Sequence, residues 1–287
     1  MIYKYSQLHN KVTDIEYVKY KVLHLGQLKL LLSEILYLTK CASDNNKVVY
    51  VGAAAGYHIP LLADMFPNLM FDLWDPGHFG ISESRNIKIF NKFFTQSDAK
   101  NYRDEGHNIL FISDIRNLNI QHLKNDTPAM DKLVMDDMNN QMNWVKTMKP
   151  LNAYLKFRLP YTPGKTTYFG GTIYMQIYSP SSTETRILVR DYDSKKIYDN
   201  EGFDKTMGYF NCCIRNSKEK NKRWFDIMEK YNLKNNWDSE MALYTIDYYL
   251  RKIKKIRSDE EVVKMFINFI DVLGDKNNKK YRPLFIK

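Results

Sequence analysis

The sequence predicts an α/β protein with a doubly wound, mostly parallel β-sheet, helices on both faces of the sheet and one antiparallel strand. Three observations support this fold class. Short β-branched and aromatic runs alternate with helical patterns over residues 26–161, a glycine-bearing turn follows the first run, and acidic residues stand where two later runs end. Strands and helices that alternate in this way are typical of parallel sheets, because a helix usually forms the crossover between parallel strands.

The first half of the chain predicts two helices and four strands. The segment 26–40, GQLKLLLSEILYLTK, is predicted to be a helix, and KVVYV at 47–51 a strand that leads into a second helix at 58–66. The apolar residues of the first helix recur at helical spacing: Leu28, Leu31, Leu32, Ile35 and Leu38. Three further strands are predicted at 69–75, 86–94 and 108–114.

The second half continues the alternation and then changes character. Residues 131–149 are predicted to form a helix, and NAYLKFRLPY at 152–161 a fifth strand. The segments 170–179 and 184–192 are close enough in sequence to form an antiparallel pair. From about residue 218 the pattern becomes helical and basic.

We therefore expect three parts in one domain. Residues 1–24 form a polar N-terminal arm, residues 25–215 the core, and residues 216–287 a basic helical extension packed on that core. The extension contains the basic run LRKIKKIR. Residues 252–255 of this run are expected to hold RNA phosphates, and the alternative is an ordinary solvated helix face.

Composition favours a polyanionic partner and a reducing compartment. The chain of 287 residues carries 43 Lys and Arg against 33 Asp and Glu, a net charge of +10, which attracts nucleic acid first and an acidic membrane surface second. The three cysteines do not have the spacing of a disulfide framework or a zinc site. The most apolar stretch, 28–38, is too short to span a bilayer, so a cytoplasmic protein is expected.

The turn after the first strand is a candidate nucleotide-binding element. Gly52 and Gly56 lie in VVYVGAAAG, and Asp75 ends the next strand about 20 positions later, where doubly wound folds place an acid that accepts ribose hydroxyls. Asp114 ends the fourth strand and faces the same crevice. These residues suit a nucleoside cofactor such as S-adenosyl-L-methionine. The alternatives are an ordinary tight turn and a capping aspartate.

Lys156 is a candidate catalytic residue in the fifth strand, where it shares a face with Tyr154 and Arg158. Its strand follows the Asp114 strand through one helix, Glu184 opens a later strand, and Lys29 lies in the first helix. Two lysines and two acids near a cofactor would form a catalytic cluster. The alternative is four ordinary surface charges.

At this point the sequence resembles a known family, the poxvirus cap-specific mRNA (nucleoside-2′-O-)methyltransferases, whose members double as the small, processivity subunit of poly(A) polymerase. Five blocks carry the resemblance in order over residues 22–212: GQLKLLLSEILYL, VVYVGAAAGYHI, LFISDIR, LKFRLPY and SSTETRIL. The resemblance implies a class I, Rossmann-like methyltransferase fold and S-adenosyl-L-methionine as the cofactor, with no metal. It also implies a cytoplasmic location, in a host cell or a virion.

The resemblance assigns roles to particular residues. The family's catalytic tetrad falls on Lys29, Asp114, Lys156 and Glu184. The cofactor pocket falls on Gln27, Tyr50, Gly52, Gly56, Asp75, Phe94 and Asp114. Recognition of the cap falls on Tyr161 as a stacking ring and Asp204 as a carboxylate, and Arg158 and Arg186 are expected to hold RNA phosphates.

The chain also departs from the family pattern. Ala55 replaces a proline, Gly77 replaces an arginine of the cofactor pocket, and Pro163 replaces an acid expected near the guanine. The second stacking ring is expected from the N-terminal arm, where the candidates are Tyr3, Tyr5 and Tyr17.

These features together predict an enzyme that methylates the ribose 2′-hydroxyl of the first transcribed nucleotide of capped mRNA. The main alternative is a non-catalytic RNA-binding accessory subunit of a poly(A) polymerase, whose catalytic subunit would be a partner. A third is a methyltransferase for another RNA position or a small molecule.

Overall fold

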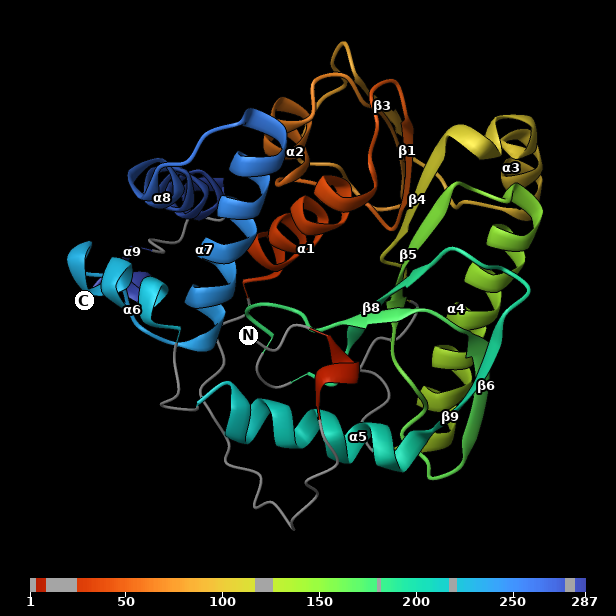
Figure 1. Cartoon of the computed structure of the whole chain (residues 1–287). Helices are drawn as coiled ribbons and strands as arrows, with labels where there is room; N and C mark the ends of the chain where they lie inside the picture. Colours follow the sequence, from red (N-terminus) through yellow and green to blue (C-terminus); the bar gives the residue numbers. More distant parts are fainter. Residues whose placement is uncertain (1–3, 9–24, 117–125, 180–181, 217–220, 277–281) are drawn as a thin grey trace.

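A seven-stranded sheet forms the centre of the protein (Figure 1). The computed structural model describes residues 4–8, 25–116, 126–179, 182–216, 221–276 and 282–287. The spatial order of the strands is β3-β2-β1-β4-β5-β8-β7. Their bounds are β1 Lys47–Val51, β2 Met70–Trp74, β3 Ile87–Phe90, β4 Ile109–Ser113, β5 Asn152–Phe157, β7 Thr172–Tyr174 and β8 Thr185–Val189.

The pairing of the strands confirms the predicted doubly wound sheet. Strands β3, β2, β1, β4 and β5 run parallel to one another, and β8 is antiparallel to both β5 and β7. The strand order reverses between β1 and β4, which is where ligands bind in open α/β sheets. The strands predicted at 170–179 and 184–192 are shorter than expected, but they do form the antiparallel pair β7–β8.

Helices cover both faces of this sheet (Figure 1). One face carries α1 (Gly26–Cys41), with α2 (Ile59–Met65), α7 (Trp237–Tyr249) and α8 (Asp259–Lys276) packed against α1. The predicted leucine and isoleucine stripe of α1 is fully buried, and each such side chain stabilises the fold by about 1.5–3 kcal/mol. The C-terminal helices therefore complete the core on this side.

The opposite face carries α3 (Gln96–Asn101) and α4 (Thr127–Met148). Helix α4 begins before the predicted start at Asp131, because Asp126 caps it by accepting a hydrogen bond from the backbone N–H of Ala129 at 3.0 Å. Pro128 is tolerated in the first turn, where its missing N–H would have no helical partner.

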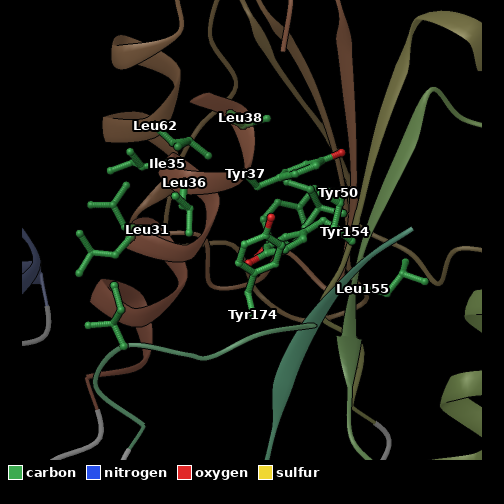
Figure 2. Close-up of a cluster of buried hydrophobic side chains, with 14 of the residues drawn as sticks. Leu31, Ile35, Leu36, Tyr37, Leu38, Tyr50, Leu62, Tyr154, Leu155 and Tyr174 are labelled. Carbon is green, nitrogen blue, oxygen red and sulfur yellow. The ribbon is translucent and has the colours of Figure 1, made fainter. Parts of the chain in front are cut away.

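Buried tyrosines join α1 to the sheet, as Figure 2 shows. Tyr37 of α1 stacks on Tyr154 of β5, with ring centroids 4.7 Å apart, and the Tyr154 hydroxyl is hydrogen-bonded to Ser33 at 2.8 Å. The Tyr154 face of β5 is thus covered by α1. The stacked rings stabilise this contact beyond the effect of the apolar area that they bury.

A second, two-stranded sheet was not predicted from the sequence. Strand β6 (Lys165–Phe169) pairs antiparallel with β9 (Lys195–Asp199), and α5 (Asn200–Tyr209) follows directly. Phe157 of β5 packs on Tyr198 of β9 at a centroid distance of 4.9 Å. These elements lie over the end of β5 that leads toward the site described below.

The remaining elements are short. Helices α6 (Lys222–Lys230) and α9 (Arg282–Phe285) lie beside α7 and α8 (Figure 1). The single-turn elements are η1 (Tyr5–Gln7), η2 (Arg103–Asn108), η3 (Phe210–Ile214) and η4 (Leu250–Lys254). Over the part of the chain that the structure describes, no helix has the length and hydrophobicity needed to cross a membrane.

The turn after β1 requires glycine at its first position. Gly52 has φ of +84°, and a Cβ atom there would lie 2.7 Å from the backbone carbon of Asp114. This close approach joins the ends of β1 and β4, and it brings Asp114 up to the glycine turn.

The Gly52→Ala substitution should lower the free energy of unfolding by about 1–3 kcal/mol, because it combines a left-handed backbone with a steric clash. The matched control is Gly26→Ala in the first turn of α1, where an added Cβ would meet no atom within 4 Å. Chemical denaturation measures both variants. Equal stability of the two variants would contradict the requirement for glycine at position 52.

Candidate active site

Four charged side chains from four elements meet at the ends of β4 and β5. Lys29 lies in the first turn of α1, Asp114 follows β4, Lys156 lies in β5, and Glu184 directly precedes β8. Lys29 Nζ is 3.1 Å from Glu184 Oε1, and Lys156 Nζ is 2.7 Å from Asp114 Oδ1 and 3.7 Å from Glu184 Oε2. The structure thus brings together all four residues of the predicted tetrad. Their catalytic role remains a prediction.

Lys156 is held by both charges and backbone carbonyls. Its side chain is only 12% exposed. Its ammonium group donates to the carbonyl oxygens of Asp114 at 3.1 Å and Ile115 at 3.2 Å. Burial lowers the pKa of Lys156, while the carboxylates of Asp114 and Glu184 oppose that change. The amine is therefore easier to deprotonate than an ordinary surface lysine.

Glu184 is a buried carboxylate with partners on both oxygens. Its side chain is 3% exposed, and Oε1 accepts hydrogen bonds from Lys29 and, at 2.9 Å, from Gln176. Oε2 accepts from Arg116. Burial opposes ionisation, but the charges of Lys156 and Lys29 hold the pKa of Glu184 well below its usual value. Glu184 is thus ionised at neutral pH.

Arg186 corrects one of the sequence predictions. It was expected to hold RNA phosphates at the surface, but its side chain is only 3% exposed. Its guanidinium donates to Asp114 Oδ1 at 2.7 Å, because the antiparallel register of β5 and β8 places Arg186 directly opposite Lys156. Burial raises the pKa of Asp114, but the charges of Arg186 and Lys156 outweigh it and bring that pKa to about 2.

Two residues of this cluster were missed by sequence reasoning. Arg116 lies two positions after Asp114 in the quoted block LFISDIR and could have been found there. Gln176 follows β7 and reaches the Glu184 side chain and its backbone carbonyl, at 2.9 and 3.1 Å. No pattern in the sequence links Gln176 to Glu184, because the contact depends on how the chain turns between β7 and β8.

The glycine turn and Asp75 lie at the ends of β1 and β2, and β1 pairs with β4. Asp75 ends β2, and its carboxylate accepts from the backbone N–H groups of Ala54 at 3.1 Å and Gly77 at 2.7 Å. Gly52, Asp75 and Asp114 therefore lie at the carboxyl ends of adjacent strands, as predicted. Glycines at both ends of the turn allow a ligand to approach the backbone closely, and the two acids are the acceptors that ribose hydroxyls require.

Three other residues predicted to bind the cofactor are largely enclosed. Gln27 Oε1 accepts from the backbone N–H of His58 at 3.1 Å. Tyr50 is fully buried, and its hydroxyl donates to Glu34 at 2.6 Å. Phe94 is buried in an aromatic cluster, 5.1 Å from Trp74 between ring centroids. Their contact with a cofactor remains a prediction.

A buried network connects Gln27 to the core. Because Gln27 Oε1 faces a backbone N–H of His58, it is an acceptor, so Nδ1 of His58, 2.8 Å away, must carry a hydrogen. Nε2 of His58 lies 2.9 Å from Glu34 Oε2. Burial and then the Glu34 charge raise the pKa of Tyr50 well above its usual value, so Tyr50 stays a donor to Glu34.

The Glu34→Ala substitution should lower the free energy of unfolding by about 3–5 kcal/mol, because it leaves the buried Tyr50 hydroxyl and the buried His58 ring without their hydrogen-bond partner. The control is Glu201→Ala, whose carboxylate forms an exposed pair with Lys205 at 2.9 Å and contributes less than about 0.5 kcal/mol. Thermal and denaturant unfolding compare the two. A loss below about 1 kcal/mol for Glu34→Ala would show that the network is not needed.

The residues predicted to bind the cap lie beside the tetrad. Tyr161 is 37% exposed, and the Arg158 guanidinium lies over its ring, 3.7 Å from the centroid. Asp131 of α4 fixes this loop by accepting from the backbone N–H groups of Tyr161 at 2.5 Å and Thr162 at 3.0 Å. Asp204 lies on the exposed face of α5 and acts electrostatically on Arg158.

Arg158 has an unpaired donor in this region. Its Nε atom is buried and has no hydrogen-bond partner among the described residues. Burial lowers the pKa of Arg158, while Tyr161 and Asp204 oppose that change. Of the candidates for the second stacking ring, Tyr5 packs on Phe203 with centroids 4.8 Å apart, and Tyr3 and Tyr17 lie outside the described residues.

Comparisons with known proteins found a matching family model and viral relatives. The family model of the poly(A) polymerase regulatory subunit matches residues 2–272. The cap-specific mRNA (nucleoside-2′-O-)-methyltransferase of Myxoma virus (strain Lausanne) is 28% identical over 221 residues, 68% of this chain and 63% of the viral protein. The protein of the same name from Fowlpox virus (strain NVSL) is 32% identical over 182 residues, 57% of each chain. This chain thus spans about three fifths of these relatives.

Among solved structures, human methyltransferase-like protein 13 in complex with SAH aligns with 69% of this chain and 93% of its own chain, at 9% sequence identity and a TM-score of 0.32. A likeness of that size carries no argument about the site. The predicted Rossmann-like class follows instead from the observed strand order and the parallel pairing. The match over residues 2–272 shows that the chain belongs to the poly(A) polymerase regulatory subunit family.

Proposed function

We propose that this protein transfers a methyl group from S-adenosyl-L-methionine to the ribose 2′-hydroxyl of the first transcribed nucleotide of capped mRNA. One observation carries the proposal above all. A buried lysine, Lys156, is held between Asp114 and Glu184, and Asp114 lies against the Gly52 turn. The names of the Myxoma and Fowlpox relatives support the same reaction.

The chemistry needs an acceptor for the hydroxyl proton and a fixed geometry. S-Adenosyl-L-methionine, when bound, supplies a methyl group on a positively charged sulfur. Lys156, with its lowered pKa, would accept or steer the proton of the 2′-hydroxyl. Glu184 and Asp114 would hold the two lysines in place, and orientation of the reactants can itself contribute about 7–11 kcal/mol to lowering the barrier.

Recognition of the cap would use the Tyr161 loop. A 7-methylguanine ring is positively charged and stacks favourably on an electron-rich aromatic face. Arg158 covers one face of Tyr161, so the cap would use the other face, with Asp204 as acceptor for the guanine N–H groups. The half-buried Arg158 side chain would then meet a phosphate oxygen of the RNA through its guanidinium group.

A second candidate function is that of an RNA-binding accessory subunit of a poly(A) polymerase. The description of the matching family supports it, as does the net charge of +10. The two functions are compatible, since the polymerase would bind a surface outside the crevice. Both would be carried out in the cytoplasm.

Replacing Lys156 tests the proposal. Lys156→Ala should lower the rate of methyl transfer to a short capped RNA by about 10²–10⁴-fold, because a positioned proton acceptor contributes that much. The control is Lys264→Ala, whose side chain is 74% exposed on α8. The readout is labelled methyl on the 2′-oxygen of the first nucleotide. Full activity of Lys156→Ala would exclude Lys156 as the acceptor, and absence of transfer by the unaltered protein would favour the accessory role.

The pH dependence of the rate provides an independent test of Lys156. Methyl transfer should rise with pH as Lys156 loses its proton, with a midpoint below the usual lysine pKa of about 10.4. Arg116 lowers the pKa of Lys156 through its charge, so Arg116→Gln should move the midpoint to higher pH. A midpoint that does not move, or that moves to lower pH, would contradict the assignment. Lys264→Gln, remote from the cluster, should leave the profile unchanged.

A further inference from the structure

Positive side chains from four segments gather around the end of α1 that lies away from Lys29. Lys40 lies in the last turn of α1, Arg190 directly follows β8, Lys252 lies in η4, and Lys4 pairs through its backbone with Tyr174 of β7. These residues are far apart in sequence, so the fold itself assembles this surface. We refer to Lys4, Lys40, Arg190 and Lys252 as the Lys40 patch.

Aromatic rings form the centre of the patch. The ammonium groups of Lys40 and Lys252 lie 5.1 and 5.7 Å from the centroid of the Tyr248 ring. The Tyr244 ring lies almost parallel to that of Tyr248, with an interplanar angle of 7° and centroids 6.4 Å apart. Both tyrosines are half-buried.

Contacts between the segments hold the cations near one another. The Arg190 guanidinium donates to the Cys41 sulfur at 3.4 Å, directly beside Lys40. Lys40 and Tyr174, the residue paired with Lys4, line the same small hollow at the end of α1. After burial, the positive charges of Lys4, Lys252 and Arg190 all lower the pKa of Lys40. The folded chain therefore keeps these positive charges close together, and such a cluster attracts polyanions.

Lys40 and Arg190 lie away from the tetrad. Lys29 and Lys40 lie at opposite ends of α1, about 16 Å apart at a rise of 1.5 Å per residue. Glu184 precedes β8 and Arg190 follows it, which places them about 20 Å apart along that strand. Lys4 lies nearer the tetrad, because its backbone partner Tyr174 is opposite Arg186 in the register of β7 and β8. A ligand held by Lys40, Arg190 and Lys252 would thus lie outside the proposed active site.

We propose that the Lys40 patch is a second RNA-binding site, which holds the phosphates of single-stranded RNA and stacks bases on Tyr248 and Tyr244. A single strand offers regularly spaced negative charges together with flat bases, and the patch has partners for both features. An anionic lipid surface offers the charges without the bases. The inference does not depend on methyl transfer, because it concerns a surface outside the proposed active site.

The test measures binding of an uncapped oligoribonucleotide of about 16 nucleotides, without cofactor, over a range of salt concentrations. The triple variant Lys40→Gln/Arg190→Gln/Lys252→Gln should bind at least about tenfold more weakly at low salt. The slope of log K against log salt should fall by about 2, since each lost phosphate contact removes about 0.7. The matched control is Lys100→Gln/Arg103→Gln/Lys264→Gln, three exposed cations outside the patch with the same change in charge.

A separate variant tests the stacking of RNA bases on Tyr248. Tyr248→Leu retains an apolar side chain but not the flat ring, so binding should weaken by about fivefold or more with an unchanged salt slope. Thermal unfolding checks each variant, and the single Lys252→Gln substitution of an exposed side chain keeps the test decisive if the triple variant folds poorly.

Three results would overturn the proposal. One is equal loss of affinity in the patch and control triple variants, which would indicate a general charge effect. The second is unchanged RNA binding by the patch variants. The third is loss of binding only to phosphatidylserine-containing vesicles, which would assign the patch to a membrane surface. Methyl transfer to a short capped RNA is measured in parallel, so failure of the proposed enzymatic function is distinguished from failure of this one.

Discussion

Pairing of buried charges at the ends of β4, β5 and β8 is the constraint on which the rest of the site depends. An ionised group is stable in a protein interior only when opposite charges and hydrogen bonds replace water. Glu184 and Asp114 satisfy this condition through Lys29, Lys156 and Arg186. Each partner comes from a different element, so the cluster forms only when α1 and all three strands are in register. These ion pairs can therefore form only in the correctly folded protein. They also hold the lysines in place for the proposed reaction.

Helix α1 connects this cluster to the core. Its leucine stripe packs under α7 and α8, its Tyr37 stacks on β5, and its first turn supplies Lys29 and Gln27. The helix has no freedom to shift along the sheet, because the Glu34–His58 pair fixes it to the start of α2. The position of Lys29 relative to Glu184 is thus set by apolar packing and by a buried polar network together.

Much of this could be predicted from local patterns. The spacing of apolar residues identified α1 and the central strands. The spacing from Gly52 to Asp75 identified the end of the sheet where the cofactor site is proposed. The four tetrad residues were found together because the blocks that contain them match a known family. The division at residues 24 and 215 stays a prediction. The β6–β9 sheet was missed, because its strands are short, partly polar and separated by a long stretch of sequence. The role of Arg186 was wrong, because its partner depends on strand register, which residue type alone does not reveal.

The antiparallel direction of β8 has a consequence for how this chain can vary. Residues just before this strand belong to the tetrad, residues just after it belong to the Lys40 patch, and Arg186 within it faces Asp114. Side chains alternate between the two faces of a strand, so adding or removing one residue in β8 would turn Arg186 away from Asp114. It would also displace either Glu184 before the strand or Arg190 after it. The length of β8 is therefore fixed more tightly than its composition. Insertions and deletions are tolerable only in the loops beyond it.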